Sequence, residues 1–107
     1  MRAPEPQLIE AVWAHGRVMP EADAAHWRQD GCGAWMQREH FGREDGDFGW
    51  KMERVSPDGA DSPENLRPFN LGNSYDIGDS RAHCRITADR AGVPAEKYAA
   101  PPRNRRL

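Results

Sequence analysis

The stretch AWMQREHFGREDGDFGWKMERV, residues 34–55, decides the predicted fold because it carries a short apolar strand at each end. Residues 34–36 begin the first strand. Residues 49–55, GWKMERV, are predicted to be its antiparallel partner, with Trp50 and Met52 on one face. The connection is longer than a tight hairpin loop and contains an Asp-Gly turn signal. The sequence therefore predicts a β-hairpin at the centre of the domain.

Two short helices are predicted before this hairpin. Residues 6–15, PQLIEAVWAH, place their apolar side chains at helical spacing, with Gly16 as a stop signal. Residues 21–30, EADAAHWRQD, begin with acidic side chains that suit a helix N-terminus, and Gly31 follows their end. We expect both helices to pack against the hairpin.

The segments after the hairpin are predicted to be short. Residues 66–69, LRPF, should be extended because a proline biases the residue before it away from helix. A short helix is predicted from about Asn70 to Asp76, with Asn70 as its N-cap. Residues 80–98 are predicted to hold one more helix, around ITADRAG and PAEKYAA, and the last seven residues to be loose.

Length and composition restrict the class of protein. A chain of 107 residues forms one domain, or one domain with a tail. No apolar run approaches the ~20 residues that span a membrane, and the N-terminus lacks the apolar stretch of a secretory signal. Two cysteines without a CxxC argue against a disulfide framework and a four-ligand zinc site, so Cys32 is interpreted as a small buried side chain. Cys84 follows His83, a second candidate metal ligand, and the expected location is the reducing cytoplasm.

The net charge of −2 conceals two oppositely charged parts. Residues 1–79 carry eight Lys and Arg against fifteen Asp and Glu, a net charge of −7. Residues 80–107 carry seven against two, a net charge of +5. An acidic body repels phosphate, whereas the basic segment either attracts it or keeps the protein soluble. We therefore divide the chain into a domain over 1–79 and a basic C-terminal extension over 80–107.

Four motifs resemble a family of small HNH endonuclease-like proteins: WRQDGCGAWMQREHFG (27–42), FGWKMERV (48–55), SPENLRPFN (62–70) and NSYDIGD (73–79). The resemblance covers roughly two-thirds of the chain. It implies an α+β fold with a ββα-metal core over about 34–79, two N-terminal helices before it and the basic extension after it.

In such a family, a metal neutralises the scissile phosphate while a histidine deprotonates the attacking water. The resemblance places the acidic metal ligand at Glu53, the central asparagine at Asn65 and the helix asparagine, a second metal ligand, at Asn73. The general-base histidine corresponds to Arg54. His40, in the loop between the two strands, is the candidate replacement base.

Arg54 is the departure that decides the functional expectation. A guanidinium has a pKa above ~12 and accepts no proton at neutral pH, and loss of a general base costs ~10²–10⁴ in rate. The resemblance therefore implies a nuclease fold that has lost its chemistry, and enzyme activity is not the leading expectation. No cofactor is expected. A divalent metal ion, Mg²⁺ or Zn²⁺, is expected only if the site at Glu53 and Asn73 is retained.

Three functions remain open from the sequence. The first is a degenerate HNH-like protein that acts by binding a protein partner, for example as an inhibitor or an assembly component of a nucleic-acid-handling complex. The second is a metal-dependent endonuclease with an atypical active site. The third is a nucleic-acid-binding module whose basic tail, with Arg103, Arg105 and Arg106, attracts phosphate. None of the three involves a membrane partner.

Overall fold

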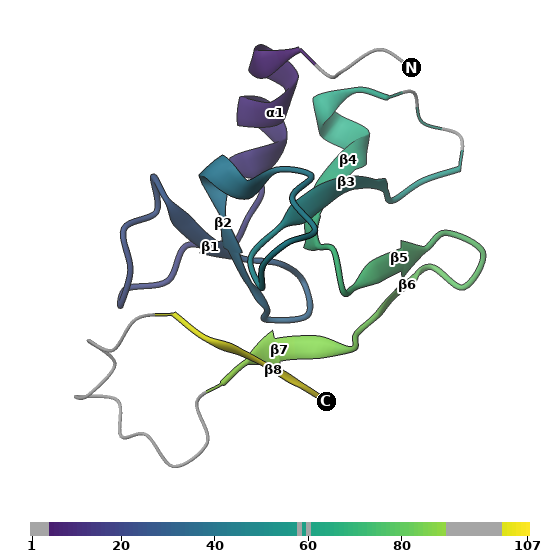
Figure 1. Cartoon of the computed structure of the whole chain (residues 1–107). Helices are drawn as coiled ribbons and strands as arrows, with labels where there is room; N and C mark the ends of the chain where they lie inside the picture. The colour runs from purple at the N-terminus through teal and green to yellow at the C-terminus, as the bar shows by residue number, and fades with distance from the viewer. Residues whose placement is uncertain (1–4, 58, 60, 90–101) are drawn as a thin grey trace.

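The computed structural model describes residues 5–57, 59, 61–89 and 102–107, and this part of the chain contains one α-helix and eight short strands. The strands form four two-stranded antiparallel sheets, β1–β2, β3–β4, β5–β6 and β7–β8 (Figure 1). The helix α1 covers Pro6–Trp13, and the strands are β1 Trp27–Gln29, β2 Trp35–Gln37, β3 Trp50–Arg54, β4 Leu66–Asn70, β5 Ser74–Asp76, β6 Arg81–His83, β7 Ile86–Ala88 and β8 Asn104–Arg106. Two short 3₁₀ turns precede β3 and β4, η1 at Arg38–His40 and η2 at Pro63–Asn65.

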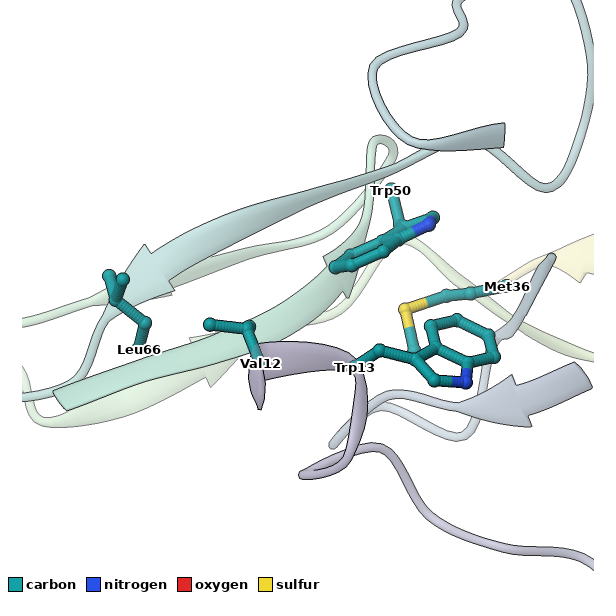
Figure 2. Packing of buried hydrophobic residues seen from close by; sticks show 5 residues of the cluster. All are labelled: Val12, Trp13, Met36, Trp50 and Leu66. Carbon is teal, nitrogen blue, oxygen red and sulfur yellow. The ribbon is translucent and has the colours of Figure 1, made fainter. Parts of the chain in front are cut away.

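The hydrophobic core lies where α1 packs against β2, β3 and β4 (Figure 2). The rings of Trp13 and Trp50 are 5.2 Å apart between centroids and tilted by 49°. Such aromatic pairs add about 0.5–1.5 kcal/mol beyond the area that they bury. The buried cluster consists of Val12, Trp13, Met36, Trp50 and Leu66. The first predicted helix is therefore confirmed, and its apolar stripe supplies two of these five residues.

The predicted pairing of the central hairpin is wrong. β3 pairs with β4, so that Trp50 lies opposite Asn70 and Arg54 lies opposite Leu66. The extended structure predicted for residues 66–69 is confirmed, because they lie within β4. Five residues of β4 match all five of β3, whereas β2 offers three. β4 also packs against α1.

The second predicted helix, over residues 21–30, is also wrong. Its last part forms β1, which pairs with β2 around a turn where Gly33 has a φ of 81°. Trp27 and Trp35 lie on the same face of this sheet, with ring centroids 6.4 Å apart in an edge-to-face arrangement. Cross-strand pairing gives Trp27 an aromatic partner, and this tertiary contact outweighs the weak helical signal of the segment.

No helix forms over residues 70–76. Asn70 ends β4, and its side-chain Nδ2 donates hydrogen bonds to the carbonyl oxygens of Trp35 at 3.0 Å and Asp47 at 2.9 Å. The predicted N-cap is therefore engaged in tertiary contacts instead. The following residues turn at Gly72 and enter β5.

The C-terminal region differs from its prediction in the same way. ITA, predicted to open a helix, forms β7, and residues 104–106, predicted to be loose, form β8 beside it. PAEKYAA lies outside the described residues. The expected α+β fold with a ββα-metal core, two N-terminal helices and a basic C-terminal extension is therefore wrong. The described part of the chain is instead a set of antiparallel hairpins around one short helix.

None of the helical segments in residues 5–57, 59, 61–89 and 102–107 is long and apolar enough to cross a membrane.

Candidate functional site

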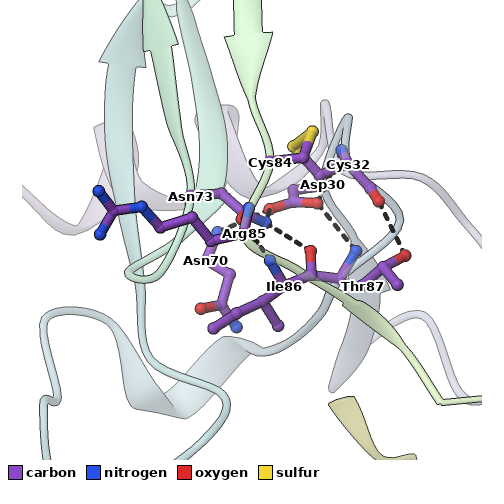
Figure 3. The surroundings of a disulfide bond; sticks show 9 residues. Asp30, Cys32, Asn70, Asn73, Cys84, Arg85, Ile86 and Thr87 are labelled. Atoms are coloured by element: carbon purple, nitrogen blue, oxygen red, sulfur yellow. Dashed lines mark hydrogen bonds between the residues drawn. A yellow bond between two sulfur atoms is a disulfide. The ribbon is translucent and has the colours of Figure 1, made fainter. Parts of the chain in front are cut away.

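A buried polar cluster of Asp30, Asn70 and Asn73, here called the polar clamp, joins three parts of the chain (Figure 3). The Asp30 carboxylate accepts four hydrogen bonds. Oδ1 accepts from the backbone N–H groups of Cys32 and Ala34, each at 2.9 Å. Oδ2 accepts from the backbone N–H of Asn70 at 2.9 Å and from Nδ2 of Asn73 at 3.0 Å. A buried carboxylate is tolerated when its oxygens are satisfied in this way.

Asn73 connects the polar clamp to the start of β7 through further hydrogen bonds. Its Oδ1 accepts hydrogen bonds from the backbone N–H groups of Arg85 at 2.7 Å and Ile86 at 2.9 Å. Its Nδ2 also donates to the carbonyl oxygen of Ile86 at 3.0 Å. The polar clamp therefore fixes the start of β7, while the side chain of Arg85 extends away from it (Figure 3).

A disulfide between Cys32 and Cys84 reinforces the same junction, with a Cα–Cα distance of 5.5 Å. Next to it, the Thr87 hydroxyl donates to the carbonyl oxygen of Cys32 at 3.0 Å. The expectation of two unpaired thiols is therefore wrong. The two cysteines are 52 residues apart in the sequence, and this spacing does not predict a disulfide. Only the fold brings them together. The predicted cytoplasmic location rested on unpaired thiols, and the disulfide removes this basis.

The partner strand β8 is anchored through Asn104. Its Oδ1 accepts from the backbone N–H of Trp35 at 2.7 Å, and its Nδ2 donates to the carbonyl oxygens of Trp35 and Asp47, each at 3.0 Å. Asn104 also lies opposite Ala88 in the β7–β8 register. Both strands of this hairpin are thus bound to the body by side-chain hydrogen bonds.

The β7–β8 hairpin carries a concentration of positive charge, here called the basic ribbon: Arg85, Arg103, Arg105 and Arg106. Arg103 forms an ion pair of 3.0 Å with Asp89. Within the part of the chain that the structure describes, no carboxylate pairs with the other three guanidinium groups, which are exposed. The sequence pointed to three of these four arginines. It did not select Arg85, although Arg85 lies in the same positively charged segment, residues 80–107.

The residues predicted to form a nuclease site are engaged elsewhere. Glu53 forms an ion pair of 3.2 Å with Lys51. Arg54 donates from Nε to Asp61 at 2.6 Å, and both side chains are exposed. The hydrogen bond from Arg54 holds the pKa of Asp61 below its ordinary value. Asp61 in turn raises the pKa of Arg54, so this guanidinium is a still poorer base.

The remaining predicted site residues have structural contacts. The buried Asn65 donates from Nδ2 to the carbonyl oxygen of Ser56 at 3.1 Å. Both lone pairs of the Asn73 Oδ1 are taken by backbone N–H groups, which leaves none for a metal ion. His40 ends η1 and is half-buried. Within the described residues, neither Glu53 nor His40 belongs to a group of three or more potential metal ligands.

One such group does occur at the β5–β6 hairpin, and the sequence singled out only its histidine, His83. Ligand atoms of Asp76, Asp79 and His83 lie within 4.8 Å of one another. The His83 Nε2 is 3.5 Å from Asp76 and 3.9 Å from Asp79. Asp76 also accepts a hydrogen bond of 2.8 Å from the backbone N–H of Gly78, which stabilises the turn after β5.

Comparison of the chain with protein-family models, with curated proteins and with solved structures finds no match.

Proposed function

We propose that this protein binds nucleic acid through the basic ribbon and acts by binding rather than by cleavage. The observation that carries the proposal is the set of three exposed guanidinium groups, Arg85, Arg105 and Arg106, that no described carboxylate neutralises. Guanidinium is suited to phosphate because its planar N–H groups bind two phosphate oxygens at once.

The anchoring of the ribbon supports this proposal. The polar clamp and the disulfide hold β7, and Asn104 holds β8, so the arginine backbones are fixed before any ligand binds. In the β7–β8 register, Arg105 lies opposite Thr87 and Arg106 lies opposite Ile86. Because they are neighbours in a strand, the two arginine side chains lie on opposite faces of the hairpin. The two guanidinium groups can therefore contact phosphates on opposite sides of the hairpin, and they do not enclose one ion.

The charge of the rest of the molecule restricts where a polyanion can approach. Residues 1–79 carry a net charge of −7, which repels phosphate from other surfaces. Three phosphate contacts without base contacts give only non-specific affinity, in the range of about 10⁻⁴–10⁻⁶ M. We therefore propose weak, sequence-independent binding.

The absence of cleavage follows from the chemistry of the residues at the nuclease positions. Arg54 accepts no proton, Glu53 is paired with Lys51, and Asn73 has no free lone pair. A bound phosphodiester would therefore meet neither a general base nor a metal ligand set at these positions.

The test is a salt titration of binding to fluorescent duplex and single-stranded DNA and to RNA, by anisotropy. We expect the logarithm of the association constant to fall with a slope of about −2.7 on duplex DNA, from three contacts at about −0.9 each. Between 50 and 200 mM salt this slope corresponds to a loss of about 40-fold. Removal of two arginines, in Arg105→Gln/Arg106→Gln, should reduce the slope by about 2.

The matched control is Arg38→Gln/Arg54→Gln, which removes the same charge from two exposed arginines that pair with carboxylates. This control should leave the slope unchanged. Equal loss in both double variants would mean that net charge, and not the basic ribbon, controls binding. No binding at 50 mM salt would reject the proposal.

A second candidate, a protein partner with a basic surface, is favoured by the acidic loop between η1 and β3. Glu44, Asp45 and Asp47 are exposed there. Such a partner would be a protein whose own nucleic-acid-binding surface is covered by this acidic body. It predicts that the protein competes with DNA for a basic DNA-binding protein, and that Glu44→Gln/Asp47→Asn weakens this competition while Arg105→Gln/Arg106→Gln does not.

A further inference from the structure

A pocket of about 260 Å³ opens between β4, the β5–β6 hairpin and the bridge that joins Arg17 to Gln29. Its volume lies slightly below the range of about 300–1,000 Å³ that is common for small-molecule sites, so it suits a small ligand. The lining combines cationic side chains with an aromatic wall. None of these residues belongs to the basic ribbon.

The cationic side chains at the pocket are Arg17 and Arg67, and His15 lies in the lining with them. Among the described residues, no carboxylate pairs with Arg17 or Arg67. One nitrogen of Arg67, Nη1, donates to the carbonyl oxygens of Glu64 at 3.0 Å and Leu66 at 2.8 Å, which holds this guanidinium in place. Its other nitrogens remain able to donate to a ligand.

His15 is held at the same edge of the pocket. Its Nε2 donates to the carbonyl oxygen of Pro63 at 2.9 Å, which leaves Nδ1 without a partner in the described structure. The only acidic side chain in the lining is Asp30, and its four hydrogen bonds within the polar clamp already satisfy it. Two arginines against one aspartate give the lining a positive net formal charge.

The wall of the pocket is apolar and aromatic. Phe69 is buried, and its ring centroid is 6.2 Å from that of the half-buried Tyr75, with an interplanar angle of 44°.

We propose that this pocket binds a small organic anion that carries a flat ring. Arg17 and Arg67 bind the anionic group, a phosphate or a carboxylate, and Phe69 and Tyr75 contact the ring. Aromatic side chains contact rings by stacking or edge-to-face, and guanidinium groups bind both oxyanions in a bidentate manner. This site is independent of nucleic-acid binding by the basic ribbon.

The test is calorimetric titration of the full chain with four probes. Adenosine 5′-monophosphate and indole-3-acetate each combine a ring with an anion, adenosine has the ring alone, and inorganic phosphate has the anion alone. We expect at least one ring-bearing anion to bind at least ten-fold more tightly than adenosine and than phosphate. Binding of the nucleotide alone identifies a phosphate ligand, and binding of indole-3-acetate alone identifies a carboxylate.

Substitutions of the lining residues test whether the ligand binds in this pocket. Arg17→Gln and Arg67→Gln should each weaken it at least five-fold, and Tyr75→Leu should weaken it without the folding risk of changing the buried Phe69. Arg105→Gln/Arg106→Gln should leave it unchanged, which separates this site from the basic ribbon. Failure of both ring-bearing anions to bind, equal binding of adenosine, or undiminished binding by both arginine variants would overturn the proposal.

Discussion

The Asp30 carboxylate accepts a hydrogen bond of 3.0 Å from the side-chain amide of Asn73, and both residues are only 2% exposed. The two residues are 43 positions apart in the chain. Through this contact, the turn between β1 and β2 is joined to Arg85, the residue just before β7. The position of the basic ribbon therefore depends on a buried polar group and not on local strand propensity.

Asp30→Asn should destabilise the protein strongly. The substitution places an NH₂ group where the carboxylate accepts from N–H donors, so at least one buried donor loses its acceptor. Hydrogen bonds to charged groups contribute about 1.5–3 kcal/mol each, and we expect the free energy of unfolding to fall by at least about 3 kcal/mol. Urea denaturation measures this loss.

The matched control for that measurement is Asp61→Asn, which changes an exposed carboxylate whose partner is Arg54. Exposed ion pairs contribute little to stability, so the control should differ little from the unmodified protein. If Asp30→Asn lost no more stability than Asp61→Asn, the carboxylate would have no structural role.

The disulfide should contribute a large part of the stability. Its cysteines are separated by 52 residues, and the loop-closure estimate for that length is about 4 kcal/mol. Cys32→Ser/Cys84→Ser should therefore lower the free energy of unfolding by up to about 4 kcal/mol. Addition of a reductant should lower the stability of the unmodified protein by a similar amount and leave the double variant unchanged. A reductant effect that persists in the double variant would exclude the disulfide as its cause.

The contact between His26 and Glu39 should make stability depend on pH. The Glu39 carboxylate accepts a hydrogen bond from Nδ1 of His26, and this bond raises the pKa of His26 above 6.5. For Glu39, burial acts to raise the pKa, but the hydrogen bond with His26 and the other attractive contacts outweigh burial and lower the pKa below 4.5. The contribution of His26 is complete below pH 6.5 and is lost as pH rises through its raised pKa. The contribution of Glu39 is complete above pH 4.5 and is lost as pH falls.

The pair therefore contributes most between pH 4.5 and 6.5. His26→Gln should flatten the pH dependence of the unfolding midpoint above pH 6.5, measured by thermal melts from pH 5.5 to 8.5. Because His26 is exposed, the change is expected to be small and to weaken with salt. An identical pH profile in the variant would show that the pair is not formed in solution.

Nuclease activity is expected to be absent from both the unmodified protein and Arg54→His. Restoring a histidine supplies a base, but Asn73 still has no free lone pair for a metal ion. Supercoiled plasmid and single-stranded DNA incubated with Mg²⁺, Mn²⁺, Ni²⁺ or Zn²⁺ provide the assay. Metal-dependent nicking that disappears in Glu53→Ala would contradict this expectation and would direct the search to His40 as the base.

The sequence by itself determined the elements whose apolar pattern is local. The first helix and the extended segment at residues 66–69 follow from spacing and from a proline, because both signals act within a few residues. The excess of positive charge after residue 79 is also a property of the sequence alone.

The tertiary structure decided which strands pair and which polar side chains become buried. Residues 21–30 and 70–76 form no helix, because long-range contacts outweigh their local helical signals. Asn70 illustrates this outcome, since its side chain bonds to Trp35 and Asp47 where the sequence suggested a helix cap. Three features depend on partners at least 12 residues away in the sequence: the disulfide, the polar clamp and the fixed arginines of the basic ribbon. A local sequence pattern does not predict contacts at such separations.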